Sequence, residues 1–227
     1  MNSNEFIMRL KLSRAVYLTV FLIGCILLWY LVRQNHPEFT KTCELTKVFQ
    51  DNLLKLSYRV HKVLDIMSLN HCLCYGALWG QVRRSSTLPW EADVEFCVNN
   101  KELSAFDENF IDRLFRKHNL TLLYDSAEGI YSITDHGFQP GAQVKLIVFE
   151  EDPKLDVMRR IGWKRRMLPP NCEDSKSLDC FPVRLLRKPL PMKLFGSEQM
   201  PVPWESLEIL KYHYPDNWWL EVFPLNC

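Results

Sequence analysis

The sequence predicts an α+β domain that follows a single membrane-spanning helix. Two stretches with apolar residues near the helical period, 45–69 and 104–118, predict amphipathic helices. Shorter apolar runs bounded by turn-forming residues predict strands, and these runs lie at 93–96, 120–124, 129–134 and 144–149. Because the two kinds of element are mixed along the chain, we expect helices packed on one face of a small mixed sheet.

The second helix and the strands after it carry boundary signals. Ser104 is expected to cap this helix, because a serine side chain can accept a hydrogen bond from the first turn. The apolar pattern ends near His118. The segment Asp125 to Gly129 is rich in turn-forming residues and is expected to join two strands.

The membrane-spanning helix is predicted at residues 15–32, a run of eighteen residues without a charge. This is about the length that crosses a bilayer core as a helix. Basic residues are denser before the run, at 9–14, than after it, where Arg33 and Lys41 follow. The positive-inside tendency therefore places the N-terminus in the cytosol.

We accordingly expect a type II signal-anchor protein of the Golgi or endoplasmic reticulum membrane. Its parts are a cytosolic tail at 1–14, the anchor at 15–32, a short stem at 33–42 and a lumenal domain at 43–227. A cleaved signal peptide is the alternative, although residues 34–37 offer no small-residue cleavage pattern.

Composition limits the function classes. The chain has 227 residues and 47% hydrophobic content, which is enough for one membrane segment and one domain. Its 28 basic and 27 acidic side chains leave a net charge of +1. There is no global field to attract a polyanion, so we expect no nucleic-acid partner.

The stretch from residue 71 to 98 has the most distinctive pattern. Gly76 and Gly80 predict a glycine-centred turn, and acidic residues follow at alternate positions, Asp93 and Glu95. Alternate side chains on a strand share one face, so these two carboxylates should project together. Paired carboxylates on a rigid strand suit Mg²⁺ or Mn²⁺. A solvated strand face is the alternative.

Two segments of this stretch resemble a known family. Residues 76–83, Gly-Ala-Leu-Trp-Gly-Gln-Val-Arg, and 89–95, Pro-Trp-Glu-Ala-Asp-Val-Glu, are similar in order and spacing to the motif of the LicD family of phosphotransferases. This family includes the fukutin-related proteins. The likeness continues through C-terminal Phe-Pro and Tyr/Trp segments and covers about residues 72–219.

The resemblance implies a fold, a chemistry and roles for residues. The fold would be nucleotidyltransferase-like. Asp93 and Glu95 would be the catalytic carboxylates that hold Mg²⁺ or Mn²⁺, while Gly76, Gly80 and Arg83 would contact the phosphates of a nucleotide-linked donor. The metal would assist in-line displacement.

The chain departs from the family pattern at Lys145. Family members carry an aspartate near the start of this strand as a third carboxylate, whereas a lysine ammonium would repel a metal. If Lys145 reaches the surface, or pairs with Glu150 or Asp152, one metal can still be held. Ala92 also replaces one carboxylate of the family's acidic run.

Cysteine usage fits an oxidising compartment. Eight cysteines are present, and one of them, Cys25, falls within the expected membrane segment. Cys172 and Cys180 bracket a polar loop and are expected to form a disulfide. Cys72 and Cys74 lack the usual two-residue metal spacing and are expected to be buried or disulfide-bonded, with a zinc site as the alternative.

Two surface features suggest further sites. Residues 159–166 form a basic and aromatic cluster, which is either a solvated face or a surface for phosphate groups. Asn119 begins an Asn-Leu-Thr sequon and is expected to carry a glycan if the domain is lumenal.

Two functions from different classes are consistent with the sequence. The first is a transferase that moves a phosphocholine-like or ribitol-phosphate-like group from a CDP-type donor to a glycan acceptor, as the resemblance implies. The second is a catalytically inactive relative that binds a glycan or a partner glycosyltransferase. Lys145 is the residue that separates the two.

Overall fold

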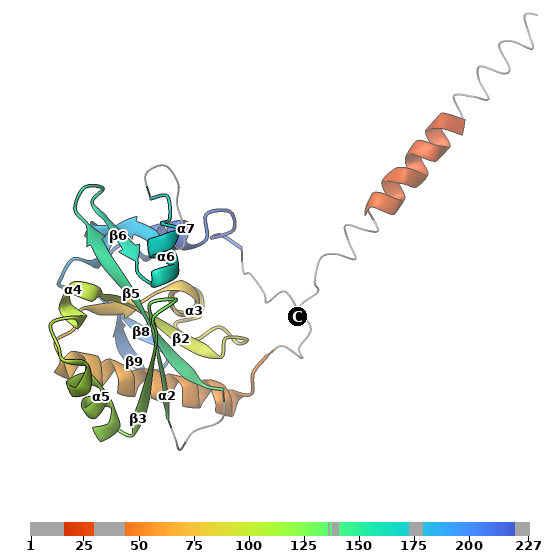
Figure 1. Ribbon diagram of the computed structural model, residues 1–227. Coiled ribbons are helices and arrows are strands. Elements are labelled where there is room, and N and C mark those ends of the chain that lie inside the picture. The colour runs from red at the N-terminus through yellow and green to blue at the C-terminus, as the bar shows by residue number, and fades with distance from the viewer. Residues whose placement is uncertain (1–15, 30–43, 136, 138–140, 173–178, 221–227) are drawn as a thin grey trace, which may run out of the picture. The chain divides into compact units, whose positions relative to one another are not determined.

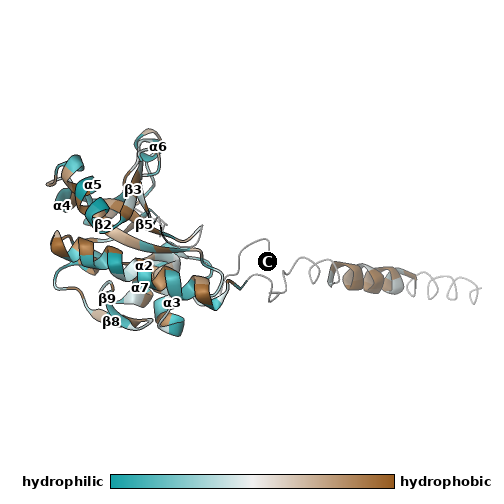
Figure 2. Ribbon diagram, turned by 90° about the horizontal axis from the view of Figure 1, so that it is seen from below, coloured by the Kyte–Doolittle hydropathy of each residue, from teal (hydrophilic) through white to brown (hydrophobic). Residues whose placement is uncertain are grey.

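The computed structural model describes residues 16–29, 44–135, 137, 141–172 and 179–220 (Figure 1). Residues 44–220 fall within one compact unit, and residues 16–29 form a helix in another. That helix is apolar along its length (Figure 2). Across the described ranges, no helix combines the length and the apolar character needed to cross a membrane. The expected tail at 1–14 and the whole of the expected stem at 33–42 lie outside the described residues.

The main unit is built on a seven-stranded mixed sheet, so the expected α+β class is confirmed. Five strands lie in the order β1-β2-β5-β4-β3, and β6 and β7 extend the sheet from β5. The pairing of β2 with β5 is parallel, and the other pairings are antiparallel. The strands are β1 His71–Leu73, β2 Asp93–Asn99, β3 Leu120–Asp125, β4 Ile130–Asp135, β5 Gln143–Asp152, β6 Val157–Arg160 and β7 Cys180–Pro182. A separate hairpin pairs β8 Met192–Phe195 with β9 Glu198–Pro201.

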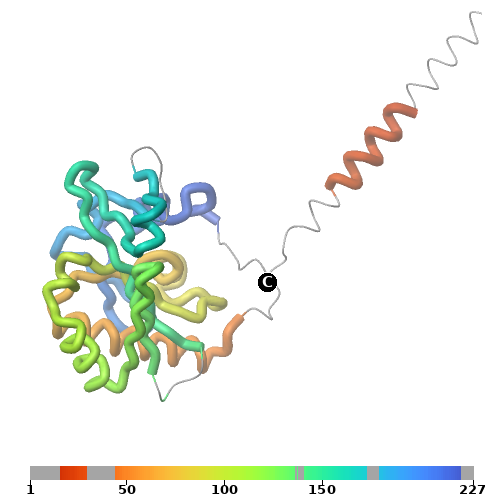
Figure 3. The backbone as a smooth tube through the Cα atoms, in the orientation of Figure 1, coloured from red at the N-terminus to blue at the C-terminus, as the bar shows by residue number. Residues whose placement is uncertain are grey.

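Helices connect and cover these strands, and the tube in Figure 3 follows the chain through them. The longest, α2, packs against β2, β4 and β5, whereas α3 contacts β2 and α7. The helices are α2 Lys47–Ile66, α3 Tyr75–Arg84, α4 Asn100–Leu103, α5 Glu108–Lys117, α6 Trp163–Met167 and α7 Ser206–His213, with a 3₁₀ turn at Val183–Leu186.

Two local expectations were wrong. Gly76 and Gly80 lie within α3 rather than in a turn. Ser104 ends the short helix α4, and Asp107 caps α5 by accepting hydrogen bonds from the N–H groups of residues 109 and 110. The serine signal failed because an aspartate three residues later offers an equivalent cap at the start of the stronger apolar stripe.

Strand β2 has the alternation that the sequence predicts. Val94 and Phe96 are fully buried, whereas Asp93 and Glu95 are half-buried on the other face. The apolar side chains of this strand pack in the core shared with α2 and β5. The core therefore fixes the direction in which the two carboxylates point.

Candidate functional site

Three carboxyl groups gather where α3 begins. Asp93 and Glu95 project from β2, and Glu91 from the turn before it shares a hydrogen bond with Asp93. The Gly76 N–H, in the first turn of α3, donates to Glu95 Oε2 at 2.9 Å. The structure thus brings together Asp93, Glu95 and Gly76, and it adds Glu91, to which the sequence analysis gave no role.

Gly76 permits this close approach. A Cβ atom at this position would lie 2.9 Å from Glu91 Oε1 and 3.5 Å from Glu95 Oε2. The first of these is shorter than van der Waals contact allows, so a side chain here would displace Glu91. Glycine at this position therefore leaves Glu91 free to lie directly against the first turn of α3.

Lys145 lies beside these carboxyl groups from β5. The parallel register places Lys145 opposite Glu95, and its ammonium forms an ion pair with the Asp93 carboxylate. The two side chains are 29% and 14% exposed, so water screens the pair only in part. The ammonium neither reaches the surface freely nor pairs with the more distant acidic residues of its own strand.

Lys145 does not take Glu150 or Asp152, the partners that would have left Asp93 available to a metal. Arg159, which lies on the neighbouring strand β6, binds both, with nitrogen–oxygen distances of 3.2 and 3.4 Å. These two carboxylates are on the far half of β5 and already have a cation. Asp93 is consequently the carboxylate that Lys145 neutralises.

The remaining two carboxyl groups favour their protonated forms. Burial, together with the charges of Asp93 and Glu91, raises the pKa of Glu95 to about 8. Burial and the nearby Asp93 raise the pKa of Glu91 to about 7. With Asp93 paired to Lys145, the set carries little net charge near neutral pH.

This arrangement does not fit a divalent cation. A Mg²⁺ or Mn²⁺ site needs several ionised oxygens that face one point. Here the Lys145 ammonium takes the Asp93 carboxylate, and the Gly76 N–H donates to Glu95 Oε2. The metal that the family resemblance implies for Asp93 and Glu95 is therefore opposed by the protein's own charges.

Gly80 and Arg83 lie farther along α3. A Cβ at Gly80 would meet the Ser86 carbonyl oxygen at 2.4 Å, so this glycine allows the chain to turn back against the helix. Arg83 is seven residues beyond Gly76, roughly 10 Å along a helix. Its guanidinium donates to the Trp219 carbonyl at 2.6 Å and lies over the Trp79 ring. The structure does not bring Arg83 to the carboxyl groups.

The C-terminal helix supplies residues that the sequence analysis did not single out. The His213 ring stacks on the Tyr75 ring at 4.0 Å, and His213 Nδ1 accepts the Tyr75 N–H. Burial lowers the pKa of His213 to about 3, so it is a neutral support for the start of α3. Burial raises the pKa of Tyr214, which follows α7, and the charges of Glu95 and Glu91 act in the same direction. No local sequence signal links Tyr75 to His213, which is 138 positions farther along the chain.

The described part of the chain contains two disulfides, one of which lies at the site. The expected bond between Cys172 and Cys180 is confirmed. A second joins Cys74, just before α3, to Cys97 on β2, and Cys72 is a buried thiol. The Cys74 bond ties the start of α3 to the carboxylate strand across 23 residues of sequence.

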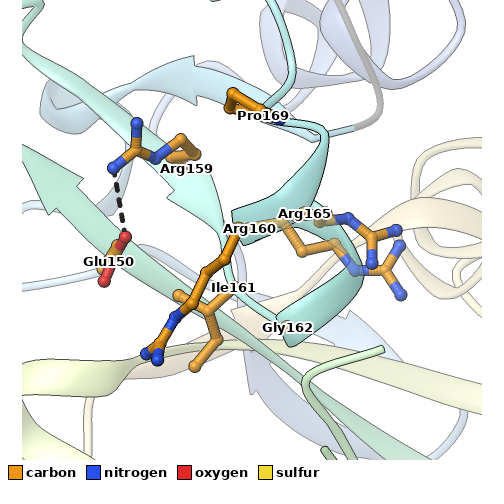
Figure 4. Close-up of a pocket in the computed structure, with 8 residues that line it drawn as sticks. Glu150, Arg159, Arg160, Ile161, Gly162, Arg165 and Pro169 are labelled. Carbon is orange, nitrogen blue, oxygen red and sulfur yellow. Dashed lines mark hydrogen bonds and ion pairs between the residues drawn. The ribbon is translucent and has the colours of Figure 1, made fainter. Parts of the chain in front are cut away.

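The basic cluster at 159–166 is largely neutralised. Its side chains surround a cavity of about 220 Å³ beside β6 and α6 (Figure 4). Arg159 points toward Glu150, and Arg165 binds both Asp179 and Glu128, with nitrogen–oxygen distances of 2.8 and 2.9 Å. These ion pairs hold α6 against the turn before β4, which favours a structural role over phosphate binding.

Comparison with known proteins agrees with this architecture. No curated protein matches the chain significantly. The family model described as LicD/FKTN/FKRP, nucleotidyltransferase domain, matches residues 68–205, which are 138 of the 227 residues. The match includes the carboxyl groups, Lys145 and the whole seven-stranded sheet. The chain therefore belongs to the LicD/FKTN/FKRP family of nucleotidyltransferase domains.

Proposed function

We propose that this chain is a membrane-anchored LicD-family domain that binds a glycan beside the carboxyl groups of β2, without metal-assisted phosphoryl transfer. The ion pair between Lys145 and Asp93 carries the proposal. An internal cation satisfies the carboxylate on which a metal-dependent site would rely. The chain corresponds to the inactive relative that the sequence left open as an alternative.

The chemistry of the site favours a sugar over a nucleotide. A diphosphate needs concentrated positive charge, whereas Lys145 is already paired and Arg83 is bound to a backbone carbonyl. Protonated Glu91 and Glu95 can donate hydrogen bonds to hydroxyl groups, and the Asp93 carboxylate can accept them. A set of fixed donors and acceptors with little net charge is suited to the hydroxyl groups of a neutral polyol.

Aromatic residues lie next to these groups. The charges of Glu95 and Glu91 act on Tyr214, whose ring is 5.8 Å from that of Trp79. Trp218 and Trp219 continue the segment, and Trp219 is half exposed. Aromatic faces of this kind pack against the apolar face of a sugar ring, which adds affinity without charge.

Metal binding distinguishes this proposal from a transferase. Calorimetry measures the heat when Mn²⁺ is added to the full-length protein, with and without CDP-ribitol or CDP-choline. Wild type and Asp93→Asn should give the same heat, because no metal binds at Asp93. A glycan array should show binding that Asp93→Asn and Tyr214→Phe weaken about tenfold, whereas Glu151→Gln, an exposed change on β5, leaves it unchanged. Mn²⁺ binding that nucleotide strengthens and Asp93→Asn abolishes would contradict the proposal.

A metal-dependent phosphotransferase is the second candidate, and Glu91 is the observation that favours it. Glu91 brings a third carboxyl group to Asp93 and Glu95, where the family pattern has an aspartate on β5 instead. A donor's phosphates could draw Lys145 away and supply the missing negative charge. In that case Glu91→Gln would lower nucleotide-dependent Mn²⁺ binding at least tenfold.

The proposal also includes the location of the domain. We propose that residues 15–32 anchor the chain in a Golgi or endoplasmic reticulum membrane, that the domain is lumenal, and that a partner glycosyltransferase or its glycan product is the ligand. Asn119, the sequon asparagine, is exposed between α5 and β3 with a φ of 55°. An exposed turn is accessible to an oligosaccharide.

Sealed microsomes test this arrangement. The domain should resist added protease, and endoglycosidase should shift the wild type but not Asn119→Asp, which keeps the left-handed backbone tolerable. Digestion of residues 42–227 in intact vesicles would show that the topology is wrong. A missing shift in a protected domain would remove only the glycan at Asn119.

A further inference from the structure

A second cluster of polar groups lies at the opposite end of β1 from the carboxyl groups. His61 and Asp65 are one turn apart near the end of α2, and His71 begins β1 after a short connection. One ligand atom from each of the three residues lies within 4.8 Å of the others. Since the i and i+4 positions of a helix share a face, His61 and Asp65 approach His71 together.

The two imidazole rings meet at close range. His61 Nδ1 is 2.7 Å from His71 Nε2, and His61 Nε2 is 3.4 Å from Asp65 Oδ2. Two nitrogen ligands of one zinc ion at about 2.0–2.1 Å would be slightly farther apart than this. A metal in place of this hydrogen bond would use His61 Nδ1, whereas Asp65 faces His61 Nε2, so the rings must open and the exposed Asp65 carboxylate must turn toward the ion.

The orientation of His71 is fixed from behind. Its Nδ1–H donates to the Leu69 carbonyl at 2.7 Å, so the lone pair is on Nε2, directed at His61. Metal-binding histidines generally make this kind of outer contact, which holds the ring and selects the ligating nitrogen. The chain between α2 and β1 thus builds both the ligand and its support.

The cluster is reachable from solvent. A cavity of about 490 Å³ is lined by His61, Asp65 and His71, and also by Asn70 and Lys188. The Asp65 side chain is 60% exposed, whereas both rings are largely buried. A metal could enter from this cavity and keep one position for water, as zinc sites with three protein ligands do.

Nearby charges leave the cluster free to accept a cation. The Lys188 ammonium, at the rim, binds Glu102 at 3.1 Å and the Ser68 carbonyl at 3.3 Å. Lys62, next to His61, lies 3.5 Å from Glu198. Each of these cations has a carboxylate of its own, in contrast to Lys145, which competes directly for Asp93.

We infer that His61, Asp65 and His71 bind one Zn²⁺ ion, with a fourth position open to the cavity. Two imidazoles and one carboxylate are ligands that zinc accepts, and the ion would join the end of α2 to β1. His71 pairs with Val98 in the sheet, five residues from Asp93 and so about 16 Å along the strand. This site is therefore separate from the carboxyl groups and does not depend on the proposed function.

The test uses the full-length, tag-free protein in detergent after chelator treatment and dialysis. Co²⁺ should produce the intense visible absorption of a four-coordinate site, and Zn²⁺ should displace it at one equivalent. Asp65→Asn, an exposed change, should weaken Zn²⁺ binding at least tenfold, and His61→Gln should abolish the Co²⁺ absorption. Asp51→Asn on the same helix and Asp93→Asn at the carboxyl groups are controls that should bind as wild type does.

Circular dichroism should show that each variant is folded, and Zn²⁺ should raise the melting temperature of the wild type but not of Asp65→Asn. Absence of Co²⁺ absorption in the wild type would overturn the inference. Binding that survives both Asp65→Asn and His61→Gln would do the same, because the ion would then lie elsewhere.

Discussion

Replacing Glu95 with glutamine should change stability in a manner that depends on pH. Glutamine keeps the size and the acceptor oxygen, so the Gly76 N–H retains its partner at 2.9 Å. The substitution removes the carboxyl group that gains or loses a proton. In the wild type, burial and the charges of Asp93 and Glu91 raise the pKa of Glu95 from 4.5 to about 8.

The sign follows from proton linkage. Between pH 4.5 and 8 the folded state holds the proton more tightly than the unfolded state, so the stability of the wild type falls as the pH rises. This loss of wild-type stability is complete above pH 8, and there is no loss below pH 4.5. At about 1.4 kcal/mol per pH unit, the upper limit for Glu95→Gln is roughly 4–5 kcal/mol of added stability at pH 9. Movement of the ionised side chain toward water reduces this, and we expect about 2 kcal/mol.

Urea unfolding followed by tryptophan fluorescence at pH 5 and pH 9 measures the effect. The difference between Glu95→Gln and wild type should be near zero at pH 5 and about 2 kcal/mol in favour of the variant at pH 9. Glu151→Gln changes an exposed carboxylate on β5 and should show no pH dependence. A variant that is equally or less stable than wild type at pH 9 would refute the reasoning that Glu95 is held protonated by its surroundings.

Three further predictions concern the charge of Lys145, the disulfide between Cys74 and Cys97, and the hydrogen bonds of Tyr58 with the β8–β9 hairpin. Lys145→Asp should destabilise the metal-free protein by about 2–4 kcal/mol, since it replaces a half-buried ion pair with repulsion. Adding Mn²⁺ should restore the melting temperature of this variant. No response to Mn²⁺ would show that β2 cannot form a metal site. Joint replacement of Cys74 and Cys97 by serine should lower the stability by about 3 kcal/mol, the value for a loop of this length. Thermal unfolding without reductant measures the loss, and an unchanged melting temperature would mean that the bond does not form. Tyr58→Phe should lower the free energy of unfolding, measured in urea, by about 1–3 kcal/mol. The Tyr58 hydroxyl donates to the Phe195 carbonyl and accepts the Ser197 N–H, and both groups would lose this partner. A loss below about 0.5 kcal/mol would contradict this account.

Local patterns predicted the elements of the fold and the direction of its strand residues. The alternation at Asp93, Val94, Glu95 and Phe96 is a property of adjacent positions, and a strand converts it directly into a buried and a polar face. The same reasoning found β3, β4, β5 and α2. It failed for α3, because two glycines indicate a turn by propensity, whereas the backbone at Ser86 packs so closely against Gly80 that a side chain cannot fit at this position of the helix.

Partners distant in sequence were beyond such patterns. Lys145 was identified as a departure from the family motif, but its choice of Asp93 depends on the parallel register of β2 and β5 and on Arg159 having taken the acidic residues farther along the strand. The stacking of His213 on Tyr75 and the bond from Cys74 to Cys97 likewise arise only when the sheet and helices assemble. A sequence shows which charges exist, whereas the packing decides which of them meet.

This distinction explains how a family site can keep its shape while changing its chemistry. The surroundings of Asp93 and Glu95 are held by the core beneath β2, by Gly76 and by the Cys74 disulfide, none of which requires a metal. Lys145 then supplies a permanent positive charge beside Asp93, and proton uptake reduces the negative charge of Glu91 and Glu95. A divalent ion would have to displace the ammonium from Asp93 and be joined by two partly buried carboxyl groups in their ionised forms, each at a free-energy cost. The ion pair of Lys145 with Asp93, at the position of the family's metal site, therefore opposes a divalent ion there.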